Sequence, residues 1–194
     1  MPTTDPKALG RRAILLGVGM LLAVSLISSP TFNDPVDTYG YGLRVTARIT
    51  FAFFMLAYVA RPVQQLFGVG SWLVRHRRYL GLAAAFSHTV HFGYIVLWAN
   101  ASGEEIALVT LIFGGGAFVF LWLMALTSND LSVRRLGLWW KRGHRFGMHY
   151  VWIVFVYTFM GVALAVPWYW FFVGAGLAGL LLRILARARR PSPG

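Results

Sequence analysis

The chain has no cysteine and only six acidic residues, against eighteen lysines and arginines. The absence of cysteine excludes disulfides, thiolate zinc sites and iron–sulfur clusters held by this chain. Only 12% of the 194 residues are charged and 58% are hydrophobic, which is too apolar for a soluble domain of this size. The net charge of +12 would favour nucleic acid in a soluble protein, but the aromatic residues lie in apolar runs rather than between basic residues. We therefore expect the lipid bilayer as a partner, and no nucleic acid.

Six apolar runs predict six membrane-spanning helices, at about residues 13–29, 45–66, 79–99, 106–127, 146–166 and 168–186. The second is the weakest, because Arg48 and Arg61 bracket only about a dozen strictly apolar residues and both must snorkel. Residues 30–43 are predicted to form a loop, 68–78 and 128–145 to form basic connectors, and Pro167 to make the last turn. Arg11 and Arg12 are interpreted as the basic flank of an uncleaved first helix rather than as a twin-arginine export signal.

The charges of the connections predict the orientation of these helices. Fifteen of the eighteen lysines and arginines lie in the N-terminal segment, the two basic connectors and the C-terminal end from Arg183 onward. The other two turns carry the acidic residues Asp34, Asp37, Glu104 and Glu105. Because basic loops stay on the cytoplasmic side, we expect an all-α, six-helix transmembrane bundle with both termini cytoplasmic. The expected division is a cytoplasmic segment 1–12, a membrane domain 13–187 and a basic cytoplasmic tail 188–194.

The five histidines are the candidate functional residues. His88 and His91 lie deep in the third apolar run, where an ionisable side chain is costly and is best interpreted as functional. His91 is about 20 Å above the basic connector, near the height of Tyr157 on the fifth helix. His76 and His144 lie at the basic entry of the third and fifth helices. Histidines on facing helices at one height predict haem ligation, at one or two stacked sites.

Several arginines lie at the basic entry of these helices, near His76 and His144. Haem propionates there would find charge-assisted partners. Each histidine also has a plainer interpretation, since it could simply bond a neighbouring carbonyl. His88 is an alternative ligand or a supporting group for His91. His149 points about 140° away from His144, so the two do not readily serve one iron. His76 also fits an interfacial basic cluster. The arginines are Arg75, Arg77, Arg78, Arg142 and Arg145.

Four stretches in order carry a resemblance to a known family. They are RRYLGLAAAFSHTVH followed by Tyr94, Asp34-Pro35-Val36 leading to Ala60-Arg61-Pro62-Val63, the run Ala125-Leu126-Thr127-Ser128, and LGLWWKRGHR. Over about residues 34–165 the chain resembles the ferric reductase-like transmembrane family. The resemblance implies a six-helix bundle in a bacterial inner membrane that carries electrons through haem b, with ligands on the third and fifth helices.

His91 and His144 match histidine positions of that family. Where the family usually has a second histidine on the fifth helix, thirteen residues after the first, this chain has Tyr157. Tyrosinate can ligate ferric haem, as in catalase. His88 or His149 could instead substitute through a shifted geometry, or the chain has lost one haem or both.

The leading functional prediction is a haem b electron-transfer subunit of an oxidoreductase system. No dinucleotide-binding motif is present, so we expect a separate donor, either a flavin reductase or a quinol, and a separate acceptor protein on the outer face. Flavin and quinone are the other candidate cofactors. The alternative is a haem-poor scaffold or interaction protein, which Tyr157 favours. A transporter is disfavoured because the spans contain no acidic residue and no evident broken helix.

Overall fold

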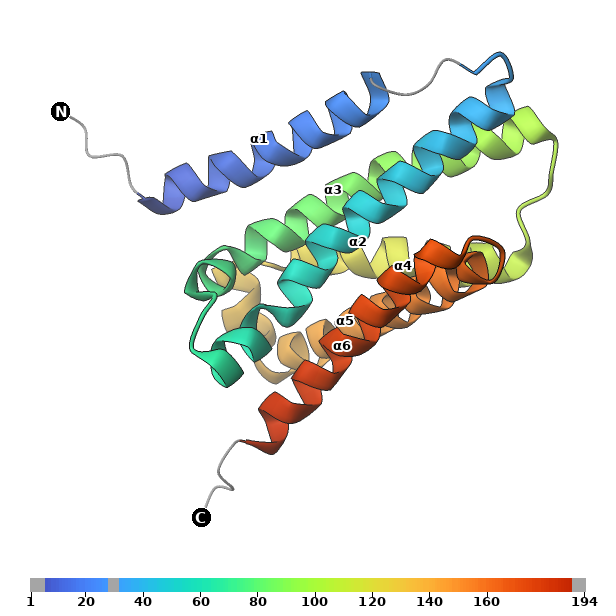
Figure 1. Cartoon of the computed structure of the whole chain (residues 1–194). Helices are drawn as coiled ribbons and strands as arrows, with labels where there is room; N and C mark the ends of the chain where they lie inside the picture. The colour runs from blue at the N-terminus through green and yellow to red at the C-terminus, as the bar shows by residue number, and fades with distance from the viewer. Residues whose placement is uncertain (1–5, 28–31, 190–194) are drawn as a thin grey trace.

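A computed structural model of the chain describes residues 6–27 and 32–189 (Figure 1). This part of the chain is helical throughout and contains no strand. The six α-helices confirm the predicted all-α class and helix number. In chain order the elements are α1 (Pro6–Ile27), α2 (Pro35–Phe67), α3 (Ser71–Ser102), α4 (Leu108–Leu126), α5 (Asp130–Ala165), the short 3₁₀ helix η1 (Pro167–Tyr169) and α6 (Trp170–Ala188).

Five of the helices, α2 to α6, are long and apolar enough to cross a membrane. Large apolar side chains cover their outer surfaces, including Leu108 and Leu126 on α4 and Phe171 on α6. Such continuous exposed apolar area is expected where lipid replaces water. The chain is therefore a multi-pass membrane protein. In α1 the described apolar stretch, Ile14–Ala23, is shorter, so the crossing by α1 stays a prediction.

The helices run alternately up and down. The starts of α1, α3 and α5 and the ends of α2, α4 and α6 gather at one end of the bundle, on the left of Figure 1. This end, called the basic end below, contains the arginines of residues 61–78, 134–145 and 183–189. The acidic residues Asp34, Asp37, Glu104 and Glu105 lie at the opposite end, where α2 begins and α3 ends.

The predicted loop over residues 30–43 is wrong from Pro35 onward, because α2 already begins there. The Asp34 side chain accepts a hydrogen bond of 2.9 Å from the Val36 backbone nitrogen, and Pro35 occupies the first turn. Asp at the cap and Pro in the first turn are strong helix-start signals.

Gly42 is tolerated inside the helix because it lets Tyr94 of α3 pack against the α2 backbone; a Cβ there would lie 2.2 Å from the ring.

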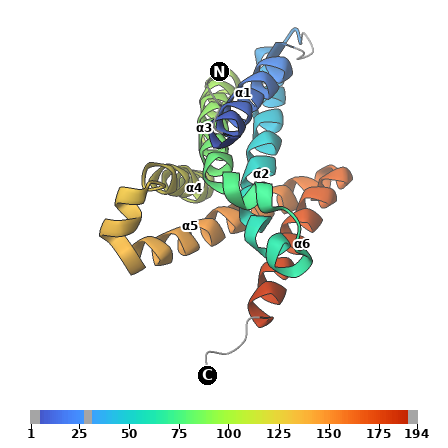
Figure 2. The ribbon, with the colours of Figure 1, turned by 90° about the vertical axis from the view of Figure 1, so that its left-hand side faces the viewer.

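The two predicted basic connectors are also mostly helical. Only residues 68–70 separate α2 from α3, and Gly68 (φ 71°) ends α2 in the left-handed conformation. Helix α5 begins at Asp130, capped by the Asn129 side chain, and bends at Gly137 (φ 49°, ψ −114°). Figure 2 shows its first turns at an angle to the rest. The prediction failed because the helices continue through the basic residues that flank the apolar runs.

Aromatic side chains form the centre of the bundle. Phe51 of α2 lies between Phe155 and Phe159 of α5 and Phe172 of α6, with ring centroids 5.1–5.7 Å apart. Helix α1 lies along α3 on the side of the bundle away from α5 and α6 (Figures 1 and 2). Val18 is among its buried residues. Helix α3 packs against α2 and α4, and α5 packs against α4 and α6.

Candidate cofactor site on helix α3

His91 is held by the first turns of α2. Its Nδ1 lies 3.1 Å from the Leu43 carbonyl oxygen and 3.1 Å from the Thr46 hydroxyl oxygen. A carbonyl can only accept, so Nδ1 is the nitrogen that carries the proton. The Thr46 hydroxyl donates to the Gly42 carbonyl at 2.7 Å, which leaves its oxygen free to accept from His91 as well. Nε2 of His91 therefore keeps its lone pair, and no other described residue forms a hydrogen bond with it.

This arrangement is the one that ligand histidines need. A histidine that binds a metal through Nε2 almost always donates Nδ1–H to a carbonyl, a carboxylate or water, which fixes the tautomer and the ring orientation. The ring is half-buried, and the hydrogen bonds come from a second helix. His91 therefore fits axial ligation of haem iron.

His88 lies one turn below His91 and is 8% exposed. Its Nδ1 is buried without a hydrogen-bond partner in the described part of the chain. Its ring is 5.4 Å from that of His91, 6.1 Å from Phe118 of α4 and 6.3 Å from Phe155 of α5. An unsatisfied buried nitrogen costs about 1–3 kcal/mol, and such a group calls for a partner such as water or a ligand. Because both histidines project from one side of α3, they cannot bracket one iron from opposite faces.

Tyr157 lies on the outer face of α5, and this placement does not favour it as the candidate ligand at the height of His91. The buried face of α5 contains Val151, Phe155 and Phe159 at helical spacing. Tyr157 is two residues from each phenylalanine, about 200° around the helix, and is 58% exposed. The α5 side chain that lies against His88 is Phe155.

His144 lies between α4 and α5. Its Nδ1 is 3.2 Å from the Trp140 carbonyl and its Nε2 is 3.2 Å from the Met124 carbonyl, while the Trp140 ring packs 4.0 Å away. A neutral imidazole has one N–H and satisfies only one of these acceptors. His144 would have to release Met124 before its Nε2 could ligate a metal.

His76 points toward α1. Its Nδ1 bonds the Trp72 carbonyl at 2.9 Å, and its buried Nε2 has no partner among the residues described. The α1 backbone covers this nitrogen at Gly10, where a Cβ would lie 2.1 Å from it. His76 and His144 therefore pack against different helices, which disagrees with the predicted lower site between them.

The remaining predicted residues lie toward the basic end of the bundle, and two of them contact α2. His149 meets Tyr58 of α2, with Nδ1 and the phenol oxygen 3.1 Å apart. Arg77 donates from Nε to the Ala57 carbonyl at 3.0 Å, so it binds the α2 backbone. Arg142 lies over the Trp139 ring at 5.7 Å. Three more of the predicted arginines are exposed, and their contact with haem propionates stays a prediction: Arg75, Arg78 and Arg145.

Sequence reasoning missed the residues that support these groups. Thr46 and the Leu43 carbonyl hold His91, and Arg183 of α6 donates to the Tyr58 carbonyl at 3.0 Å. The sequence does contain a signal for the contact between Arg183 and Tyr58. Pro62 has no N–H, so the Tyr58 carbonyl, four residues earlier, lacks its helical hydrogen-bond partner. No comparable signal pointed to Leu43, since its carbonyl is bonded across two helices.

Within residues 6–27 and 32–189, no three or more His, Asp or Glu side chains gather closely enough to hold a metal ion. Haem needs only one or two protein ligands, because the porphyrin supplies the others. A small pocket of about 210 Å³ lies at Leu43, the residue whose carbonyl bonds His91. It is lined by Gly40, Leu43, Arg44 and Trp98.

The chain is similar to proteins named MsrQ, the haem-binding subunit of protein-methionine-sulfoxide reductase. It is 35% identical to MsrQ of Brucella anthropi over 118 residues, which are 58% of this chain and 51% of that protein. It is 42% identical to MsrQ of Rhizobium meliloti over 99 residues, which are 47% of this chain and 45% of that protein. The predicted likeness to the ferric reductase-like family thus rests on MsrQ in particular.

The magnetosome protein MamZ of Magnetospirillum gryphiswaldense is 32% identical over 113 residues, which are 55% of this chain and 17% of MamZ. The chain spans about half the length of the MsrQ proteins it matches. No protein-family model matches it, and no solved structure matches it either.

Proposed function

We propose that the protein is a haem b-binding membrane subunit that transfers electrons, and that His91 is an axial ligand. One observation carries this proposal: Leu43 and Thr46 hold Nδ1 of a membrane-embedded histidine and leave Nε2 free. The similarity to haem-binding MsrQ subunits supports it independently. Haem b bound there would supply one-electron oxidation and reduction at its iron.

The residues around His91 would set its properties as a ligand. The Leu43 carbonyl keeps the proton on Nδ1 and raises the basicity of Nε2, which favours the ferric state. Phe118 and Phe155 surround the neighbouring His88 with apolar surface and exclude water. His88 Nδ1, without a partner in the described structure, would be free to form a hydrogen bond with a bound molecule.

We propose that His91 is the sole protein ligand of this haem, because His88 lies on the same side of α3 and the other histidines are bonded near the basic end. His144 becomes available as a ligand only after it releases the Met124 carbonyl. His149 becomes available only if α5 moves away from Tyr58 of α2. Tyr157 is not included, because it lies on the outer face of α5. A site with His91 as the sole protein ligand is the simplest arrangement consistent with these contacts.

The orientation belongs to the proposal as well. We infer that the basic end of the bundle is cytoplasmic, since arginine-rich ends stay on that side of bacterial inner membranes. His91 then lies in the outer half of the membrane. A separate cytoplasmic or quinol donor would supply electrons, and a separate protein on the outer face would accept them. The pocket at Leu43 and Trp98 opens at this outer end.

Electron transfer can be measured in vesicles that hold ferricyanide inside and receive a water-soluble quinol outside. Quinol oxidation releases electrons, and each trapped ferricyanide takes up one. We expect the haem-loaded protein to speed ferricyanide reduction and His91→Ala to abolish the increase. Tyr157→Phe is the matched control and should retain it. Equal rates for His91→Ala and the unaltered chain would overturn the proposal.

A haem-poor scaffold remains the second candidate, and one observation favours it. Phe155, rather than a histidine, occupies the α5 position facing His88, and it packs against Phe51 and Phe159. With Phe155 at this position, aromatic side chains already fill the space beside His88, and the bundle needs no cofactor there. A colourless protein from cells with ample haem would support this function over electron transfer.

A further inference from the structure

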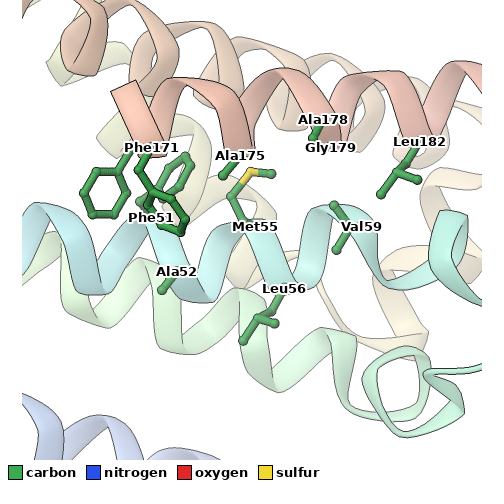
Figure 3. A pocket seen from close by; sticks show the side chains of 11 residues that line it. Phe51, Ala52, Met55, Leu56, Val59, Phe171, Ala175, Ala178, Gly179 and Leu182 are labelled. Atoms are coloured by element: carbon green, nitrogen blue, oxygen red, sulfur yellow. The ribbon is translucent and has the colours of Figure 1, made fainter. Parts of the chain in front are cut away.

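An apolar groove runs between α2 and α6 on the outer surface of the bundle (Figure 3). Its volume is about 400 Å³. Gly179 allows the close approach at its floor, because a Cβ there would lie 2.5 Å from Met55 and 3.2 Å from Val59. Along α2 the groove extends from Phe51 to Val59, about 12 Å at the helical rise. This length is close to one leaflet of a hydrocarbon core of about 30 Å.

The groove ends beside a group of arginines at the basic end. Val59 and Leu182 line this end, and their chain neighbours Tyr58 and Arg183 are in direct contact. The Arg183 guanidinium donates to the Tyr58 carbonyl at 3.0 Å and lies 4.2 Å from the centroid of its ring. One of its five N–H groups is used in that hydrogen bond, which leaves others for a ligand. The like charges of further arginines act on Arg183: Arg61, Arg145 and Arg187.

No acidic side chain balances these charges in the described structure. Four of the described acidic residues lie at the opposite end of the bundle. Asp130 is at the start of α5, on the basic end, but it is exposed and makes no hydrogen bond to an arginine. Clustered guanidinium groups without a counter-ion repel one another, and bound phosphate relieves that repulsion through charge-assisted hydrogen bonds.

We propose that this groove and the arginine group bind one anionic phospholipid, with an acyl chain along α2 and α6 and the phosphate at Arg183 and Arg187. The apolar groove ends at Val59 and Leu182, next in the chain to Tyr58 and Arg183, so the groove and the arginines together match a molecule that is apolar along its length and negatively charged at one end. Basic pockets between transmembrane helices favour such headgroups. The site is separate from His91 and does not depend on haem.

The test uses the purified full chain, stripped of lipid in a mild detergent, and measures thermal unfolding with added lipid. Phosphatidylglycerol should raise the unfolding temperature progressively as its concentration increases above the dissociation constant, and phosphatidylcholine should not. With Arg187→Gln, the same rise in unfolding temperature should require at least ten times more phosphatidylglycerol. Arg134→Gln, on the exposed first turns of α5, is the matched control and should respond like the unaltered chain.

The groove is tested separately by Ala178→Phe, which fills it from an exposed position on α6, with Leu181→Phe outside the groove as its control. We expect only Ala178→Phe to remove the response. An equal response to phosphatidylcholine or to inorganic phosphate would overturn the proposal, as would a full response of Ala178→Phe. Because the chain has no cysteine, an Ala178→Cys variant also tests for a second copy. A disulfide-linked dimer in native membranes would place a protein, not a lipid, in the groove.

Discussion

Arg183 replaces the hydrogen bond that Pro62 removes from α2. Pro62 has no N–H, so the Tyr58 carbonyl four residues earlier loses its helical partner. The Arg183 guanidinium donates to this carbonyl at 3.0 Å from α6. We therefore predict that Arg183→Met destabilises the bundle far more when residue 62 is proline than when it is alanine.

The magnitude follows from two contacts. A hydrogen bond to a charged group contributes about 1.5–3 kcal/mol, and the stacking of Arg183 on the Tyr58 ring adds about 0.5–1 kcal/mol for a half-exposed pair. Arg183→Met should thus lower the free energy of unfolding by about 2–4 kcal/mol in the chain with Pro62. With Pro62→Ala the helix provides its own N–H for Tyr58, and the same change should cost only about 1 kcal/mol.

The measurement is a double-mutant cycle of unfolding free energies in lipid-free mixed micelles of a mild detergent and dodecyl sulfate, followed by tryptophan fluorescence. Arg134→Met, on the exposed start of α5, controls for the loss of one positive charge. Equal costs of Arg183→Met in the proline and alanine backgrounds would refute the reasoning.

Three further predictions follow from individual contacts. Gly42→Ala should destabilise the α2–α3 contact by about 1–3 kcal/mol, because its Cβ would press on the Tyr94 ring, whereas Gly114→Ala, which meets nothing, should be neutral or stabilising in the same unfolding assay. Thr46→Val removes one acceptor from His91 and should weaken haem binding about tenfold by titration; the Leu43 carbonyl remains, and Thr110→Val on the exposed side of α4 should have no effect. In spheroplasts, an impermeant maleimide should label Glu104→Cys at once and Arg135→Cys only after lysis, and the reverse order would contradict the proposed orientation.

The apolar runs of the sequence predicted the helices because lipid imposes a simple length rule on each span. The same rule hid the true helix ends, since α2, α3 and α5 extend beyond the apolar runs through residues such as Tyr39, Arg75 and Arg142. The signals that would have corrected α2 were local. Asp34 followed by Pro35 is a helix start, although the glycines at 40 and 42 suggested a turn.

The candidate site was only partly predictable. Burial of His91 followed from its depth in an apolar run, but its partners did not, because a backbone carbonyl leaves no mark in the sequence. Tyr157 was placed by height along α5 alone. Its direction depends on which stripe of α5 packs inward, and Phe155 and Phe159 define that stripe. Height along a helix is therefore a poor guide to which side chains meet.

The most direct test of the central claim is the haem content of the purified chain, expressed in cells with ample haem and measured by its absorption after reduction. We predict haem b bound to the unaltered chain and to Tyr157→Phe, and its loss from His91→Ala with the fold intact by circular dichroism. Full haem content in His91→Ala, or none in the unaltered chain, would contradict the account.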